Sequence, residues 1–371
     1  MNPSLSRAVA SAPTRLFLAN PRAVFRGYPV SVTSATSITQ IHTYAHPQAR
    51  SRSYNRPQLR QRKSRISLTN PTTPTFSTSR TKSSPTATKP PMSSTSLIES
   101  AKRAACRQAV ADHFSLTFTY VGIGSGSTVA YVVEAIAELG PSVTSTMKFV
   151  PTGSGSTALI KNAGLAVLQV PDLLTEVGYH PDTAEHQPID IYFDGADEVD
   201  AELNCIKGGG ACHFQEKLVS RLSKRFICVA DSRKKVDRLL TSWAYVPVEV
   251  SPVGAEFVRR ELIRIGSKDP KIRTSGPTFI RTITDNHNHI IDAPFPTLLL
   301  NSEKDKLDPA EGLWTPAALL EKIRSIFGVL EVGIFTGFNG PDVAKLGTEI
   351  EGVKPVKAYF GRADGQVETL G

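Results

Sequence analysis

The feature that most constrains this chain is an alternation of short β-rich runs and helical patterns that begins at Tyr120. Apolar or β-branched runs lie at 120–123, 146–150, 165–170, 189–193 and 226–230. Segments with helically spaced apolar residues lie between the first three of these runs. Glycine ends both segments, at Gly140 and Gly164. This order is typical of a parallel sheet covered by helices. We therefore expect an α/β fold, a Rossmann-like open parallel sheet with helices on both faces.

The pattern changes after Trp243 and predicts a smaller α+β domain. We expect a strand at 246–250, helices at 255–265 and 316–327, and a hairpin between 279–284 and 289–292. The domain bounds that follow are 99–241 with 336–371 for the α/β catalytic domain, and 242–335 for the small α+β domain.

The first 98 residues are predicted to be a disordered basic tail. They contain 14 Lys or Arg, no Asp or Glu, and no periodic apolar pattern that could offset the entropy of ordering. The other 273 residues carry 29 basic and 34 acidic side chains, so the net charge of +9 comes from the tail. The overall charge therefore indicates neither a nucleic-acid nor a membrane partner.

Two origins of the tail stay open. Abundant Arg and Ser without acids is typical of a transit peptide, whereas Met92 would serve as an internal start that makes 1–91 an upstream extension. We expect a cytoplasmic protein, with a mitochondrial location as the alternative if 1–91 are a transit peptide.

Ligands of open parallel sheets bind beyond the carboxyl ends of the strands, so the loops there should carry the chemistry. The first such loop, GIGSGST at 122–128, leaves a strand and opens a helix. Its glycines, hydroxyls and helix N-terminus suit a phosphate, although a plain turn with a Ser/Thr cap has the same pattern. It is neither the dinucleotide motif nor a Walker A loop. A similar loop at 151–157 follows the next strand and adds to the case for a phosphorylated small molecule.

Carboxylates follow the apolar run that ends at Phe193, in the segment DGADEVD at 194–200. Acids at this edge of a sheet can hold sugar hydroxyls, relay protons or bind a divalent metal. The alternative is a solvated acidic turn.

Lys207 precedes three glycines, which places a cation beside free backbone amides and suits the stabilisation of an oxyanion. Glu216 lies on the helix that follows and is the candidate base, or else a surface glutamate. Phe214, Leu218 and Leu222 are expected to form the apolar face of this helix.

The cysteines and histidines do not predict a metal site. Cys205, Cys212 and His213 lack a second chelating pair, and none of the four cysteines lies in a CxxC motif, so free thiols are expected. His287 and His289 are expected to be loop residues rather than ligands. We expect neither a metal nor another cofactor.

Four motifs stand in order along the chain: GIGSGST at 122–128, DGADEVD at 194–200, KGGGACHFQEK at 207–217 and VADSRKKVD at 229–237. Together they resemble the A-type ribose-5-phosphate isomerase family, from about residue 101 to the C-terminus. The resemblance implies an aldose–ketose isomerase of the pentose phosphate pathway that interconverts D-ribose 5-phosphate and D-ribulose 5-phosphate through a cis-enediolate. It also implies a homodimer or homotetramer, with a sugar phosphate as its small-molecule partner.

The resemblance assigns roles to individual residues. Glu216 matches the proton acceptor, Lys207 stabilises the enediolate, and either Asp194 or Asp197 assists ring opening. The substrate contacts are Ser125, Gly126, Ser127, Thr128, Gly195, Ala196, Gly208, Gly209, Gly210 and Lys234. Lys102 is matched to a further active-site lysine.

Two other classes of protein were weighed. A CoA-transferase would use a glutamate as a nucleophile on a related glycine-rich framework, but the Ser/Thr loops and the DGAD carboxylates argue against it. A sugar-phosphate sensor with a nucleic-acid arm would need a helix-turn-helix pattern before residue 100, and none is visible.

Overall fold

The largest sheet of the computed structural model contains the strands expected from the alternating pattern. The structure describes residues 94–178, 187–276, 279–346 and 352–371. The six strands of this sheet are β1 (Tyr120–Ile123), β2 (Lys148–Pro151), β3 (Ile191–Asp194), β6 (Phe226–Asp231), β14 (Lys357–Gly361) and β15 (Val367–Leu370). Their order is β15-β14-β6-β3-β1-β2, and all neighbours are parallel except β14 and β15.

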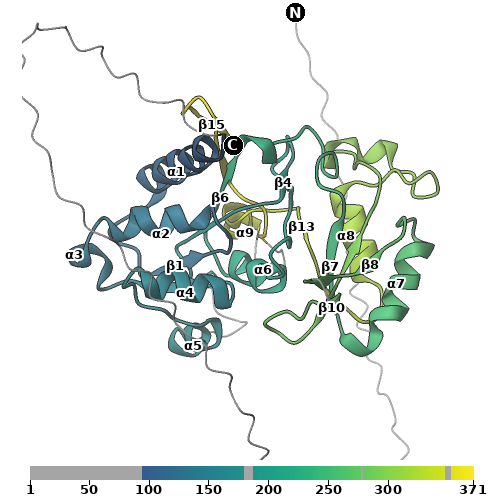
Figure 1. The fold of residues 1–371 in the computed structure, drawn as a ribbon, viewed down its shortest axis with the longest axis horizontal. Coiled ribbons are helices and arrows are strands. Elements are labelled where there is room, and N and C mark those ends of the chain that lie inside the picture. The colour runs from purple at the N-terminus through teal and green to yellow at the C-terminus, as the bar shows by residue number, and fades with distance from the viewer. Residues whose placement is uncertain (1–93, 179–186, 277–278, 347–351) are drawn as a thin grey trace, which may run out of the picture. The chain divides into compact units, whose positions relative to one another are not determined.

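Helices cover both faces of this sheet (Figure 1). The helices are α1 (Ser94–His113), α2 (Val129–Ala137), α3 (Pro141–Thr144), α4 (Ser154–Asn162), α5 (Val170–Glu176), α6 (His213–Arg221), α7 (Ala255–Arg264), α8 (Pro316–Arg324) and α9 (Gly340–Leu346), with 3-10 turns at Ser232–Lys234, Pro252–Gly254 and Asn301–Lys306. Side chains alternate along β6: Ile227 and Val229 pack in a core with α1, α2 and α4, whereas Cys228 packs with α5 and α6 on the other face. The predicted α/β class is confirmed.

A second core lies around a smaller antiparallel sheet. Its strands, in order, are β12 (Val329–Val332), β7 (Val246–Val250), β11 (His289–Ala293) and β8 (Lys271–Ile272). The core is completed by apolar residues of α7 and α8. All described residues belong to one compact unit, so the bounds 99–241, 242–335 and 336–371 remain predictions.

Two short strand groups connect to these sheets. The first is β13 (Ile334–Phe335), β5 (Cys205–Ile206) and β4 (Glu198–Val199), and the second is β9 (Thr274–Ser275) with β10 (Ile280–Arg281). Strands of two residues carry too little pattern to be recognised from sequence. In the described part of the chain, no helix combines the length and the apolarity that crossing a membrane requires.

The strand predicted at 165–170 is wrong. This segment pairs with β2 only through an isolated bridge between Phe149 and Val167. The helix α5 begins at Val170 because Pro171, in its first turn, favours helix initiation and cannot continue a ladder.

The hairpin predicted between 279–284 and 289–292 is also wrong. The strand β10 pairs with β9, while β11 pairs with β7 and β8. The buried carboxylate of Glu249 accepts hydrogen bonds from Thr284, Asn286 and Asn288, and so holds the intervening turn on the small sheet.

Candidate active site

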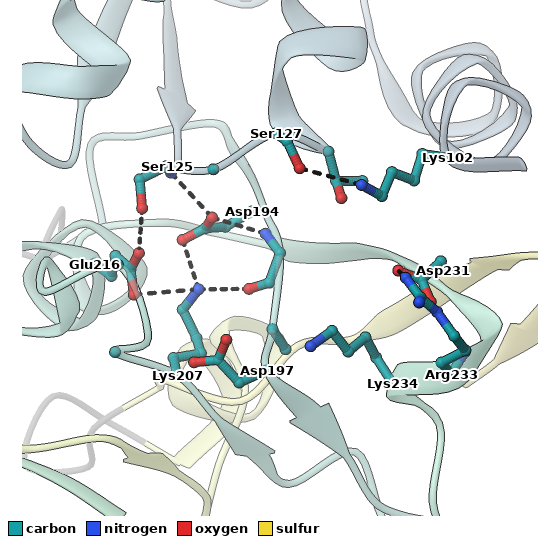
Figure 2. A pocket seen from close by; sticks show the side chains of 16 residues that line it. Lys102, Ser125, Ser127, Asp194, Asp197, Lys207, Glu216, Asp231, Arg233 and Lys234 are labelled. Carbon is teal, nitrogen blue, oxygen red and sulfur yellow. Dashed lines mark hydrogen bonds and ion pairs between the residues drawn. The ribbon is translucent and has the colours of Figure 1, made fainter. Parts of the chain in front are cut away.

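A pocket of about 340 Å³ lies beyond the carboxyl ends of β1, β3 and β6 (Figure 2). The chain leaves β1 toward β2 on one side, whereas β3 and β6 lie on the other, so this is the point where the strand order reverses. Every predicted site residue except Gly209 lines the pocket, and Lys102 lines it too.

The loop after β1 is shaped by its close approach to β3. The Gly124 N–H donates to the Phe193 carbonyl at 2.9 Å, and a Cβ at Gly124 would lie 1.9 Å from the Asp194 carboxylate. Only glycine fits there. Gly126 has φ of 98°, a conformation that favours glycine as well.

Asp194 is completely buried at the end of β3. Its Oδ1 accepts from the Ser125 N–H at 3.1 Å and the Gly195 N–H at 2.7 Å. Its Oδ2 accepts from the Tyr192 hydroxyl and from Lys207 Nζ, the latter at 2.7 Å. Burial raises the pKa of Asp194 to about 7, although Lys207 and the Tyr192 hydroxyl act in the opposite direction.

Lys207 joins two carboxylates (Figure 2). Its Nζ lies 2.7 Å from Asp194 Oδ2 and 3.3 Å from Glu216 Oε2. Burial acts to lower the pKa of Lys207, but the two carboxylates outweigh it and hold this pKa above its usual value. The ammonium therefore remains protonated, as a group that stabilises an oxyanion must be.

Glu216 lies in the first turn of α6 and is 4% exposed. Its Oε1 accepts from Ser125 Oγ at 2.7 Å. The predicted apolar face of α6 is confirmed at Leu222, which is buried in the core, and in part at Leu218, which is half-buried and packs against that core. Phe214 is half-buried, and the buried residues of the helix include the polar His213, Glu216, Lys217 and Ser220. The polar side of the helix faces inward because Glu216 lines the pocket and Lys217 forms a buried ion pair with Glu331 at 2.8 Å.

Asp197 is the second carboxylate of the loop after β3. Its Oδ2 accepts from the Gly209 N–H at 2.7 Å, so Gly209 contacts the site through this carboxylate rather than through the pocket wall. Burial raises the pKa of Asp197, while the Gly209 hydrogen bond lowers it. A half-buried carboxylate with a raised pKa is a better proton acceptor than a free aspartate.

Cations gather at the other end of the pocket from these carboxylates (Figure 2). Lys102 Nζ donates to Ser127 Oγ at 3.2 Å and to Glu99 Oε1 at 2.9 Å. Arg233 Nε donates to Asp231 Oδ1 at 2.7 Å, and Lys234 Nζ lies 5.1 Å from the centre of the Trp243 ring. With the Ser127 and Thr128 hydroxyls, this end is suited to a phosphate.

The chain was compared with known proteins. Residues 148–349 match the family of ribose 5-phosphate isomerase A (phosphoriboisomerase A). The ribose-5-phosphate isomerase of Mycosarcoma maydis is 41% identical over 271 residues, which are 73% of this chain and 80% of that protein. The Candida albicans protein of the same name is 39% identical over 279 residues, 74% of this chain and 98% of its own. The chain belongs to the ribose 5-phosphate isomerase A family.

Solved structures agree with this membership. The ribose 5-phosphate isomerase from Plasmodium falciparum has a TM-score of 0.57 at 26% identity, over 73% of this chain and 98% of its own. A D-ribose-5-phosphate isomerase in complex with phospho-erythronic acid has a TM-score of 0.57 at 29% identity, over 74% and 98%. The chain is an aldose–ketose isomerase, which sets aside the CoA-transferase and sensor interpretations.

Within this isomerase the DGADEVD carboxylates serve two purposes. Asp194 and Asp197 line the pocket, whereas Glu198 and Asp200 are buried elsewhere. Glu198 accepts from the backbone N–H groups of 240–243, and Asp200 accepts from Asn204. The solvated acidic turn considered from the sequence is therefore wrong for all four.

The second Ser/Thr loop does not line the pocket. Ser154 donates through its N–H to Asp285 Oδ2 at 2.7 Å and through its hydroxyl to Oδ1 at 3.1 Å. Ser156 and Thr157 hydroxyls donate to the Gly153 carbonyl. This loop holds the turn at 284–288 rather than a ligand phosphate.

Sequence reasoning missed Asp231 and Arg233 of the pocket and Tyr192 behind Asp194. The signal for the first two was present, because Asp231 ends β6 at the ligand edge of the sheet. The contact of Tyr192 with Asp194 could not be predicted, because in the sequence Tyr192 is one of several apolar residues of a buried strand.

The candidate metal ligands Cys205, Cys212 and His213 differ in burial. Cys205 and His213 are buried and Cys212 is half-exposed, with all four thiols free. Among the described residues no group of three His, Cys, Asp or Glu side chains is arranged to hold a metal ion. Burial lowers the pKa of His213 to about 3, so this imidazole is neutral near pH 7.

Proposed function

We propose that this isomerase interconverts D-ribose 5-phosphate and D-ribulose 5-phosphate through a cis-enediolate, with Glu216 as the proton carrier. One observation carries the proposal: Glu216, Lys207 and Asp194 form a buried ion cluster at one end of a pocket that has Lys102, Arg233 and Lys234 at the other. A relative is solved with phospho-erythronic acid, a small molecule that carries a phosphate, as the proposed substrate does.

Ring opening is assigned to Asp197 rather than Asp194. Both oxygens of Asp194 are occupied by four donors, so this carboxylate mainly orients Lys207 and the β1 loop. Asp197 lines the pocket and its Oδ2 is held by Gly209. Asp197 takes the proton of the anomeric hydroxyl, the bond from C1 to the ring oxygen breaks, and the proton passes to that oxygen.

Isomerisation then needs one base. Glu216 removes the proton from C2, and the electron pair moves to the C1 oxygen, where the Lys207 ammonium and the amides of the glycine loop stabilise the charge. Glu216 returns the proton to C1 while the hydroxyl proton of O2 moves to O1. The result is the ketose, and no net proton is gained or lost.

The experiment that tests this is ketose formation from ribose 5-phosphate by wild type and Glu216→Gln. The amide keeps the shape of the side chain and removes its basicity, so kcat should fall by roughly 10²–10⁴-fold with KM nearly unchanged. Glu138→Gln, an exposed glutamate just after α2, is the control and should match wild type. A Glu216→Gln enzyme within a few-fold of wild type contradicts the assignment.

A further inference from the structure

Arg273 connects the small sheet to the glycine loop of the site. It lies between β8 and β9, and its side chain is 12% exposed. Its Nε donates to Asp292 Oδ2 at 2.9 Å, on the neighbouring strand β11. Its Nη1 donates to the carbonyls of Gly208 at 2.8 Å and Gly209 at 3.3 Å. Arg273 does not line the pocket.

These bonds determine which way two peptide groups face. In a trans peptide the C=O and the following N–H point in opposite directions. The Gly208 carbonyl points at Arg273, and accordingly the Gly209 N–H points away from it and donates to Asp197 Oδ2 at 2.7 Å. By the same geometry, the Gly209 carbonyl on Arg273 turns the Gly210 N–H away from Arg273, and Gly210 itself lines the pocket.

We infer that Arg273, anchored by Asp292, is a positioning residue for catalysis: it holds the glycine loop so that one amide supports Asp197 and the next faces the reacting oxygens. The inference rests on the proposed function, in which Asp197 opens the ring and the loop amides stabilise the enediolate. Glycines have little conformational preference of their own, so a loop of three needs an external group to select one orientation of its peptides.

The guanidinium is suited to this task in a way that lysine is not. Its planar fork donates to Asp292 and to two carbonyls at once, and its centre lies 5.8 Å from the Tyr245 ring. A lysine ammonium keeps the charge but cannot reproduce the fork. A larger residue cannot replace the glycine at position 208, because a Cβ there would lie 2.8 Å from His213 Nδ1.

The test compares the full-length enzymes wild type, Arg273→Ala, Arg273→Lys and Arg281→Ala. Arg281 is an exposed arginine on β10, the strand paired with β9, and it does not line the pocket. Its replacement by alanine removes the same charge as Arg273→Ala. We expect kcat to fall by roughly 10–100-fold in Arg273→Ala and Arg273→Lys, with KM changed by less than about 3-fold. Arg281→Ala should match wild type. Guanidinium ion at millimolar concentration should restore part of the Arg273→Ala rate, and ammonium should not.

The pH dependence of kcat/KM is a second measurement, and it would not change if Arg273 had a purely structural role. The charged groups that face Asp197 are Lys207, Glu216 and Lys234, all unchanged in these variants. Loss of the Gly209 hydrogen bond leaves Asp197 with a higher pKa. Asp197 contributes to the acid limb of kcat/KM together with Asp194, so this limb should move to higher pH in Arg273→Lys, which keeps the positive charge. An unmoved limb overturns the inference.

The outcomes separate this inference from the proposed function. If wild type does not convert ribose 5-phosphate, the proposed function fails. If wild type is active and Arg273→Lys retains full kcat, only the role of Arg273 is overturned. Should Arg273→Ala not fold, Arg273→Lys decides the question alone, and full kcat with an unshifted acid limb overturns the inference.

Discussion

Lys207 sets the charge balance at the reacting end of the pocket. Its single ammonium faces Asp194 and Glu216, and Asp197 lies on the same side. This end is therefore negative overall, whereas Lys102, Arg233 and Lys234 make the other end positive. A sugar phosphate has the matching polarity, because its phosphate is anionic and its reacting carbons are neutral until a proton is removed.

The protonation of Asp194 should contribute to the acid side of the pH profile, together with that of Asp197. Burial raises its pKa to about 7, and the hydrogen bond from the Tyr192 hydroxyl lowers it. Below this pH Asp194 is neutral, so its ion pair with Lys207 is lost and the ammonium is no longer held in place for the enediolate. We predict that kcat/KM falls as the pH decreases through about 7, and that the fall begins at higher pH in Tyr192→Phe.

The measurement is kcat/KM for ribose 5-phosphate between about pH 5 and 9 in both enzymes. Tyr120→Phe is the matched control, because it also removes a hydroxyl that donates to a carboxylate, that of Glu176, which does not line the pocket. Superimposable profiles for wild type and Tyr192→Phe would show that Asp194 does not contribute to this limb.

At the residue scale, sequence predicts groups that belong to a motif at a strand end. Asp194, Asp197 and Lys207 were indicated in this way, whereas the role of Glu216 was indicated by the glycine loop before its helix and by the family resemblance. Arg273 was not, because it contacts Gly208 across 65 positions and sits in no motif. Only tertiary structure brings such pairs together.

Among the elements, the turn at 240–243 depends on one buried carboxylate. Glu198, in β4, is fully buried and accepts from the N–H groups of Thr241, Ser242 and Trp243. The turn carries Trp243, whose ring lies under Lys234 at the cationic end of the pocket. The stability of this turn and the position of Lys234 are therefore connected.

We predict that Glu198→Gln destabilises the protein by about 2–4 kcal/mol, since an amide replaces one acceptor oxygen with a donor facing backbone N–H groups. The melting temperature should fall by roughly 5–10 °C, and KM should rise more than kcat falls because Lys234 is displaced. Calorimetry and steady-state kinetics on Glu198→Gln and the Glu138→Gln control check both effects. An unchanged melting temperature would contradict this role.

Element prediction was accurate where both faces of a strand are apolar. It failed at 165–170, where Pro171 starts a helix, and at places where polar contacts decide. The strands at 120–123 and 226–231 were found because they are buried on both sides. The hairpin at 279–292 was misassigned because Glu249 binds its turn and β11 pairs elsewhere. The α6 face was predicted only in part, because periodicity counts apolar residues such as Leu222, and this helix also buries polar ones.

In the whole molecule, polar contacts connect the two cores. Besides Arg273 with Gly208, Asp285 accepts from Ser154 at the start of α4, and Asn286 accepts from Gln215 on α6 at 2.9 Å. Both contacts come from the turn that Glu249 holds on the small sheet. The small sheet thus supports the elements that position Glu216 and the glycine loop, although it provides none of the residues that line the pocket.

The last prediction concerns the first 91 residues. A protein that starts at Met92 keeps all of α1, which begins at Ser94 and carries Lys102, the first residue of the pocket. It loses all 14 basic side chains that precede Glu99 and has 29 basic against 34 acidic groups. We expect it to fold and isomerise as the full chain does, because the removed segment has no periodic apolar surface to add to a core.

Melting temperature and kcat of the two forms, measured side by side, test this expectation, and a form that starts at Phe114 provides the contrast. That shorter chain lacks α1, whose Ala105, Cys106 and Ala109 are buried in the core on one face of the large sheet. It should lose cooperative unfolding and activity together. The Met92 form should also lose any affinity that the full chain has for polyanions, since its charge changes from +9 to a slight excess of acid. A markedly lower melting temperature or kcat for the Met92 form would mean that the removed residues contribute to the folded enzyme.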